Sequence, residues 1–289
     1  MQRLSLIFLE FLAALFAVVP FRLLYFFSDG LAWLFLHIIK YRSKILQQNL
    51  RKAFPEKSPA EIAALQRQFY RHFSDVLLES IKGLTLQRDE LQRRFRYRNP
   101  GIFDDLLAQG KSAILLGSHV GNWEWGSLSL PLAVEHQVVG IYKPLKNPVA
   151  DAWLNRRRMR WGLQLASMAQ AGRAVIEGRN KPCIFVLIAD QTPVDVKNAH
   201  WLTFLNQDTP FLHGADKLAR QTGYPVFFVE IQRVARGFYE VSFSELCREP
   251  GKTEEGTVTK LFAERLEKHI QREPANWLWS HRRWKRARR

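Results

Sequence analysis

Hydrophobic residues dominate the start of the chain and then recur in short blocks between polar segments. Residues 4–27 are almost wholly apolar and are interrupted only by Ser5, Glu10, Pro20 and Arg22. A helix of roughly 24 residues is long enough to cross the hydrocarbon core of a bilayer. Glu10 and Arg22 disfavour a clean span, because a charged side chain at mid-bilayer costs about 2–3 kcal/mol. A re-entrant or interfacial helix bent at Pro20 is the alternative.

A second apolar stretch at residues 31–39 is followed by the basic cluster Lys40-Tyr41-Arg42-Ser43-Lys44, which is typical of the cytoplasmic side of a membrane. No small-residue cleavage site follows the first stretch, which disfavours a secretory signal peptide. We therefore expect residues 1–40 to be a membrane anchor and residues 41–289 a catalytic domain in the cytoplasm. A hairpin of buried core helices in a soluble protein is the other interpretation.

The rest of the chain alternates between strand-like and helix-like segments. Ser58-Pro59-Ala60-Glu61 has the pattern of a capping box and predicts a helix that extends to about Lys82. The alternation predicts an α/β fold with one mixed sheet flanked by helices. The expected strands are residues 113–116, 138–142, 163–168, 183–189, 226–232 and 239–243, and the expected helices include 123–132, 148–161, 171–177, 214–222 and 258–271.

Candidate chemistry lies directly after the first of these strands. His119 comes where the strand ends, and Glu124 follows five residues later, at the start of the next helix. Catalytic groups of α/β proteins gather at the carboxyl ends of strands. An imidazole there can accept a proton from a hydroxyl near neutral pH, and a hydrogen-bonded carboxylate would fix its tautomer. Gly121 and Asn122 favour a turn that returns Glu124 to His119.

No serine or cysteine lies in a nucleophile elbow, and Cys183 lies in an apolar run that favours a buried, inert thiol. We therefore expect direct attack by an activated substrate hydroxyl on an acyl donor. The H-E-x-x-H pattern of zinc enzymes is absent, and two cysteines form neither a disulfide scaffold nor a cysteine-only zinc site. We expect no metal and no cofactor.

The net charge of +16, from 43 Lys and Arg against 27 Asp and Glu, favours anionic partners. Nucleic acid, acidic lipid head groups and acidic carrier proteins all meet this criterion. A basic protein that binds nucleic acid is the rival interpretation from another functional class. It leaves the apolar amino-terminal segment and the His119–Glu124 pair unexplained.

Several motifs resemble those of the late (secondary) acyltransferases of lipid A biosynthesis, within the wider lysophospholipid acyltransferase group. The likeness covers most of the chain, and its most particular part is the carboxyl-terminal block. In chain order the motifs are HVGNWE, YKPLKNP, RRRMRWG, ADQTP, FLNQDTPFLHG and WLWSHRRWKR. The segment FLNQDT departs from the family, where many members have Phe-Phe-Gly.

The resemblance implies transfer of a fatty acyl chain from acyl carrier protein to a hydroxyl of a lipid A precursor, at the cytoplasmic face of the inner membrane. It implies that His119 is the general base and that Glu124 orients it. Arg158 matches an arginine that stabilises the thioester oxyanion or holds a phosphate, and Asp190 matches a further acidic position. With Asn122 and Arg160, these two residues form the candidate substrate-binding set.

Two further expectations follow. The site should lie at the mouth of an apolar groove that admits a lipid chain. Trp277, Trp279 and His281 should pack in the core rather than reach the membrane, because aromatic residues are mostly buried. An acyltransferase that acts on lysophosphatidate or another lysolipid is the nearest rival among enzymes.

Overall fold

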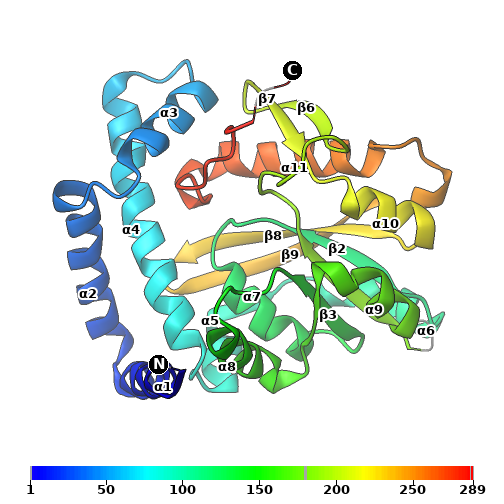
Figure 1. Ribbon diagram of the computed structural model, residues 1–289, viewed down its shortest axis with the longest axis horizontal. Coiled ribbons are helices and arrows are strands. Elements are labelled where there is room, and N and C mark those ends of the chain that lie inside the picture. Colours follow the sequence, from blue (N-terminus) through cyan, green and yellow to red (C-terminus); the bar gives the residue numbers. More distant parts are fainter. Residues whose placement is uncertain (1, 179–180, 287, 289) are drawn as a thin grey trace.

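A computed structural model describes residues 2–178, 181–286 and 288 of the chain. Its centre is a seven-stranded mixed sheet with the strand order β1-β9-β8-β2-β5-β3-β4 (Figure 1). Strands β8, β2, β5, β3 and β4 are parallel, while β9 runs antiparallel to β8. The sheet strands are β1 (Phe95–Tyr97), β2 (Ala113–Gly117), β3 (Gln137–Tyr142), β4 (Gln164–Ser167), β5 (Cys183–Ile188), β8 (Val226–Ala235) and β9 (Phe238–Cys247). The predicted fold class is confirmed.

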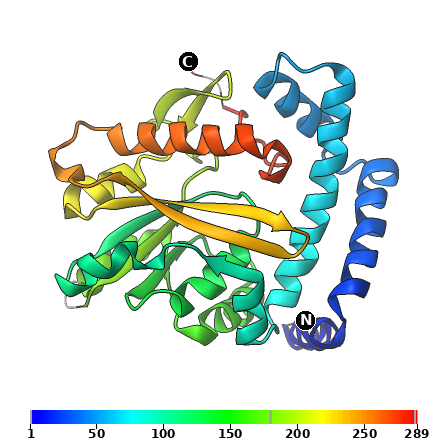
Figure 2. The same ribbon diagram turned by 180° about the vertical axis from the view of Figure 1, so that it is seen from behind.

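Helices cover both faces of this sheet, and α4 stands along the edge where the parallel strands end (Figures 1 and 2). The α-helices are α1 (Gln2–Val18), α2 (Phe21–Trp33), α3 (Ser43–Ala53), α4 (Pro59–Gly83), α5 (Arg88–Arg94), α6 (Asp104–Ala108), α7 (Trp123–Ser129), α8 (Pro148–Arg158), α9 (Ala171–Glu177), α10 (Gly214–Thr222) and α11 (Thr257–Arg272). Short 3-10 turns occupy Pro100–Phe103, Leu130–Leu132, Met159–Trp161, Met168–Gln170, Pro250–Lys252 and Pro274–Asn276.

The central strand β2 is buried along its whole length, as its continuous apolar sequence predicts. Its side chains alternate between two cores because successive residues of a strand point to opposite faces. Ile114 and Leu116 join the core beneath α10 and α11, whereas Ala113 and Leu115 join the core beneath α5, α6 and α7. The sheet is therefore held between two hydrophobic layers. The loops at the carboxyl ends of its strands lie outside these layers and can present polar side chains.

The capping box predicted at Ser58 is present at the start of α4. The backbone N–H of Glu61 donates to Ser58 Oγ over 3.3 Å, and the backbone N–H of Ser58 donates to Glu61 Oε2 over 2.8 Å. These bonds satisfy donors that a helix start leaves open. The sequence pattern gave no signal for the antiparallel hairpin of β6 (His200–Phe204) and β7 (Gln207–Phe211).

The apolar amino-terminal segment forms two helices instead of one continuous span. Pro20 lies at the junction of α1 and α2, where the anticipated bend occurs. A π-helical turn, Leu34–Ile38, extends α2. By length and composition, the candidate membrane-spanning stretch among the described residues is 21–38, later in the chain than the expected 4–27.

Burial of histidines makes the fold sensitive to acid. Burial lowers the pKa of His269 to about 4, against its ordinary 6.5, and lowers that of His72 to about 3. The folded state then binds fewer protons than the unfolded chain, so stability is lost as the pH falls below about 6.5.

We expect His269→Phe to reduce this loss. At about pH 5 the depressed pKa of His269 alone corresponds to a penalty of about 2 kcal/mol, and phenylalanine fills the same buried place against Phe228. Urea unfolding of the wild type and the variant at two pH values measures the difference. The exposed neighbour Lys268, changed to Gln, is the control. An equal acid sensitivity in His269→Phe and the wild type would contradict this assignment.

Candidate active site

His119 and Asp190 form the central contact of the site. In the sheet, Gly117 of β2 pairs with Ile188 of β5, so the residues two positions beyond each strand emerge side by side. His119 Nδ1 lies 2.6 Å from Asp190 Oδ1, and the backbone N–H of His119 donates to Asp190 Oδ2 over 2.9 Å. Two neighbouring parallel strands thus build a histidine–carboxylate pair at the carboxyl edge of the sheet.

A third donor reaches the same carboxylate from the other end of the chain. Trp277 Nε1 donates to Asp190 Oδ2 over 2.8 Å, and the Trp277 side chain is buried. The segment around Trp277 lies against the His119 loop, because the backbone N–H of Leu278 donates to the His119 carbonyl and Val120 bridges to Trp277. The carboxyl-terminal block is therefore part of the scaffold of the site.

The carboxyl-terminal block also contacts Thr192, two residues after Asp190. The backbone N–H of Thr192 donates to His281 Nε2 over 3.2 Å, and Thr192 Oγ1 donates to the Arg283 carbonyl over 2.6 Å. The Arg283 guanidinium is fully buried, donates to the Pro210 carbonyl and lies over the Phe211 ring. The expected packing of Trp277 and Trp279 in the core is confirmed, since both are buried.

The charges of the pair shift both pKa values. Burial acts to lower the pKa of His119, but the charge of Asp190, its hydrogen bond and the charge of Glu124 outweigh burial, and the pKa is raised above 6.5. Burial acts to raise the pKa of Asp190, but the charge of His119 and the three hydrogen bonds from His119 and Trp277 lower it to about 2. Asp190 is therefore ionised at neutral pH, and His119 accepts a proton more readily than a free histidine.

The other ring nitrogen of His119 lies against Gln191. Gln191 Nε2 lies 3.1 Å from His119 Nε2, and the Trp123 ring packs edge-on against the imidazole with centroids 5.0 Å apart. With Nδ1–H donated to Asp190, Nε2 carries the lone pair. This tautomer is the one that a general base requires.

The predicted hydrogen bond between Glu124 and His119 is not formed, since the ring of His119 pairs with Asp190 and Gln191. The Glu124 carboxylate instead forms a two-pronged ion pair with Arg158 of α8, at 2.6 Å and 2.8 Å from Nη2 and 3.2 Å from Nε. The turn through Gly121 does occur, with a φ of +63° where an added Cβ would lie 2.7 Å from Ile231. The helix that follows this turn directs Glu124 towards α8, and Asp190 takes the place beside His119.

Two residues of the expected substrate-binding set have structural contacts instead. Asn122 is fully buried and caps α7. Its Oδ1 accepts from the backbone N–H of Trp125, and its Nδ2 donates to the carboxylate of Glu79. Arg160 donates to the carbonyls of Gly83, Leu84 and Leu86 at the end of α4. The expected substrate contacts of Asn122 and Arg160 therefore find no support in this geometry.

The cavity beside Trp123, whose ring packs against His119, is much smaller than the expected lipid-sized groove. The cavity next to the site has a volume of about 10 Å³, less than an acyl chain needs. Its walls come from α4, from Trp123 and from the carboxyl-terminal block, and they are Phe69, His72, Phe73, Val76, Trp123, Asn276, Trp277 and Leu278.

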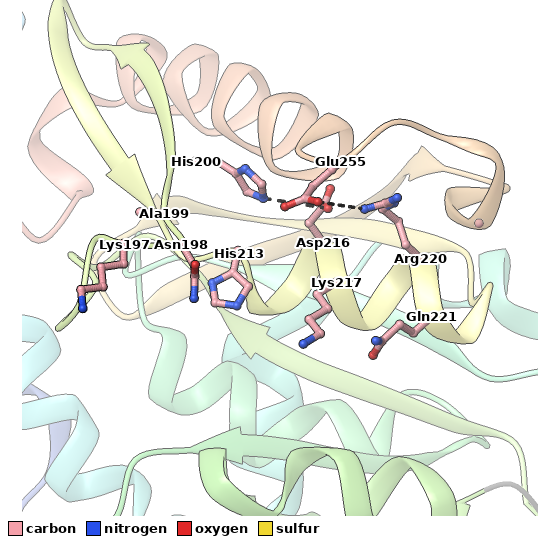
Figure 3. A pocket seen from close by; sticks show the side chains of 11 residues that line it. Lys197, Asn198, Ala199, His200, His213, Asp216, Lys217, Arg220, Gln221 and Glu255 are labelled. Carbon is pink, nitrogen blue, oxygen red and sulfur yellow. Dashed lines mark ion pairs between the residues drawn. The ribbon is translucent and has the colours of Figure 1, made fainter. Parts of the chain in front are cut away.

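A wider cavity of about 720 Å³ lies elsewhere, between β6, α10 and the segment that precedes α11 (Figure 3). Its polar lining includes His200, His213 and Lys217, and none of the site residues lines it. Asp216 in this cavity accepts from the backbone N–H groups of Gly256 and Val258 at the start of α11. Its carboxylate is therefore part of the fold, and the cavity is distinct from the His119 site.

Comparison with known proteins decides the family. The pattern of the bacterial lipid A biosynthesis acyltransferases matches residues 3–286, nearly the whole chain. The chain belongs to this family. The acyltransferase is 22% identical over 272 residues to a lipid A biosynthesis acyltransferase of Haemophilus influenzae, covering 92% of this chain and 86% of that protein. It is 23% identical over 277 residues to a lipid A biosynthesis palmitoleoyltransferase of Escherichia coli K12, covering 94% of this chain and 88% of that protein.

Sequence reasoning overlooked two contacts of this acyltransferase. Gln191 adjoins Asp190 in the ADQTP motif, so the motif itself contained the signal. The bond between Trp277 and Asp190 joins residues 87 positions apart, and the sequence carried no signal for it beyond the unusual density of tryptophan in the last segment.

Proposed function

We propose that this acyltransferase transfers a fatty acyl chain from the thioester of acyl carrier protein to a hydroxyl of a lipid A precursor, with His119 as general base. The observation that carries the proposal is the His119–Asp190 pair at the carboxyl edge of the sheet, whose Nε2 contacts only the side-chain amide of Gln191 among the hydrogen-bond partners of the described residues. Family membership supports the reaction class and the lipid A pathway. The net charge of +16 suits both an acidic carrier protein and a phosphorylated lipid.

In the proposed reaction the acceptor hydroxyl displaces Gln191 from His119 Nε2. His119 takes the hydroxyl proton while the oxygen attacks the thioester carbonyl carbon, and Asp190 stabilises the imidazolium that forms. The tetrahedral intermediate collapses, the carbon–sulfur bond breaks, and the leaving thiolate takes the proton from His119. No acyl-enzyme is needed, and Cys183 is buried in the core.

Arg158 is the proposed anion-binding residue. Its partly exposed guanidinium is held by Glu124, whose charge also acts on His119. A guanidinium in this place can stabilise the thioester oxyanion or hold a phosphate of the acceptor. Glu124 would then keep Arg158 in position rather than orient the base.

The substrate chain needs space that the small cavity does not offer. The walls of this cavity include the apolar side chains of Phe69, Phe73 and Leu278, which carry no ion pairs and can rearrange around an acyl chain. We propose that this apolar slot between α4 and the carboxyl-terminal block is where a lipid chain enters.

We further propose that the enzyme works at the cytoplasmic face of the inner membrane, with residues 1–40 as its anchor and residues 41–289 as its catalytic part. The apolar helices α1 and α2 and the basic cluster at Lys40 to Lys44 support this location.

Mass spectrometry of lipid A tests the proposed function. Cells that lack the gene should produce lipid A one acyl chain lighter, and expression of the wild-type chain should restore it. His119→Ala should fail to restore it although the protein accumulates in the membrane fraction. An unchanged lipid A in the deletion strain, together with a changed phospholipid pool, would favour a lysolipid acceptor instead.

Trp277→Phe is expected to lower kcat about tenfold, the scale of one charge-assisted hydrogen bond. The ring still fills the core, but Asp190 loses the donor that shares its charge, so the pKa of His119 should rise and the acidic limb of the kcat/KM profile should move to higher pH. Trp279→Phe is the matched control, because its buried indole donates to the Pro274 carbonyl and not to Asp190. Equal kinetic effects in both variants would refute the positioning role of Trp277.

The raised pKa of His119 also predicts the pH profile of the wild type. Only the neutral imidazole accepts a proton, so kcat/KM should fall as the pH drops through the pKa of His119, which lies above 6.5. Measurements of kcat/KM across the neutral range check this. A limb well below pH 6.5 would show that another group limits the rate.

A further inference from the structure

The two amino-terminal helices expose apolar side chains that no described element covers. On α2 the aromatic residues Phe26, Phe27 and Trp33 are exposed, Phe26 to 70%. On α1 the exposed apolar residues are Leu6, Ile7, Phe8, Phe11, Leu15 and Val18. Figure 1 shows α2 at the outer edge of the molecule alongside α4, with α1 across its lower end. We call these exposed side chains the apolar face.

Polar bonds hold α1 to the catalytic part. Glu10 accepts from Trp153 Nε1 over 2.9 Å and forms an ion pair with Arg157, both on α8. Lys82 of α4 donates to three carbonyls at the end of α1 and beyond it, those of Phe16, Ala17 and Val19. These contacts fix α1 against α4 and α8.

Helix α2 is held in the same way along its middle. Ser28 Oγ donates to the buried Asp75 over 2.5 Å, and Tyr25 donates to the buried Glu79 over 2.8 Å. Asp29 pairs with Arg236 of the β8–β9 hairpin at 2.8 Å and lies 3.9 Å from Arg71 of α4.

These bonds are incompatible with α2 as a membrane span. Asp29 lies near the middle of the candidate stretch 21–38, and its partners Arg236 and Arg71 are 31% and 69% exposed. A span would place all three charges at the centre of the bilayer, where charged side chains are costly. It would also require the catalytic part to enter the hydrocarbon with them.

We propose that α1 and α2 lie along a single leaflet of an anionic bilayer, with the apolar face buried among the acyl chains and neither helix crossing to the other side. This deepens the membrane location proposed above and rests on it. Charge complementarity favours a lipid surface as the occupant, since Arg22, Lys40 and Lys44 are exposed on or directly after these helices. In this arrangement α8, which carries Arg158, lies directly beside the membrane-bound α1.

Sidedness distinguishes the two arrangements. Epitope tags at the amino and carboxyl ends of the full chain are compared in sealed, inside-out vesicles of expressing cells treated with protease. In the single-leaflet arrangement both tags are cleaved without detergent. A spanning α2 protects the amino-terminal tag until detergent is added, and that result would overturn the proposal.

Vesicle binding tests the apolar face directly. Phe26→Ser with Phe27→Ser should lower binding of the purified protein to vesicles of phosphatidylethanolamine and phosphatidylglycerol at least tenfold, with an unchanged thermal unfolding midpoint. Ile176→Ser is the control, because Ile176 is also exposed and its helix α9 lies across the molecule from α2 in Figure 1.

Unchanged vesicle binding in the Phe26 and Phe27 variant would overturn the proposal. So would a change of oligomeric mass without a change in vesicle binding, which would show that a second copy covers the face. Neither readout uses acyl transfer, so failure here is distinct from failure of the proposed reaction.

Discussion

Replacement of Asp190 by Asn is expected to lower kcat by about a thousandfold or more without unfolding the protein. Asp190 accepts from His119 Nδ1, the His119 backbone and Trp277. An amide carries no charge to stabilise the imidazolium, and its NH2 group can donate to Nδ1, which places the proton on Nε2 where the base must be free. Steady-state kinetics with acyl carrier protein thioester measures the loss.

Asp195→Asn is the matched control, since Asp195 is an exposed carboxylate in the same loop. It should keep near wild-type kcat. The acidic limb of the residual activity of Asp190→Asn should shift to lower pH, because the charge that raises the pKa of His119 is gone. If Asp190→Asn stayed active while Glu124→Gln did not, the partner of His119 in catalysis would be Glu124 after all.

Loss of the Glu124–Arg158 pair should have the second largest effect. Arg158→Gln removes the proposed anion-binding group, and we expect kcat/KM to fall about a hundredfold, the scale of one oxyanion donor. A fall in kcat indicates oxyanion stabilisation, whereas a rise in the KM of the lipid acceptor indicates phosphate binding.

Arg156→Gln controls for the general loss of a positive charge, because Arg156 is exposed on the same helix. Its kcat/KM should stay within about twofold of the wild type, as for most exposed substitutions. Indistinguishable values for Arg156→Gln and Arg158→Gln would remove Arg158 from the site.

The regular elements were predictable because each carries a local signal. The ends of α9 and α10 agree with the hydrophobic pattern, and the capping box located the start of α4. The hairpin β6–β7 was not predicted, since its strands carry polar residues such as Thr203 and Asp208 in place of an apolar run. The helix expected over residues 4–27 is divided at Pro20 into α1 and α2, and the candidate membrane-spanning stretch begins after that proline.

The partner of His119 was beyond the reach of local sequence. Which strand lies next to β2 depends on the order of the sheet, and the contact with Asp190 joins residues 71 positions apart. Glu124, close in sequence, lies on a helix whose direction is set by the capping residue Asn122. The sequence spacing indicated the histidine of this pair, while the tertiary structure places Asp190 rather than Glu124 beside it.

The central claim is that His119 deprotonates the acceptor hydroxyl and that the acyl chain passes directly from donor to acceptor. The most direct test incubates purified enzyme with acyl carrier protein thioester and a hydroxyacyl lipid A precursor, and follows both product and intact protein by mass spectrometry. The account predicts acylated lipid with the wild type, none with His119→Ala, full activity with Cys183→Ser and no mass of an acylated protein. Substantial product from folded His119→Ala, or an acylated enzyme that forms and decays with turnover, would contradict it.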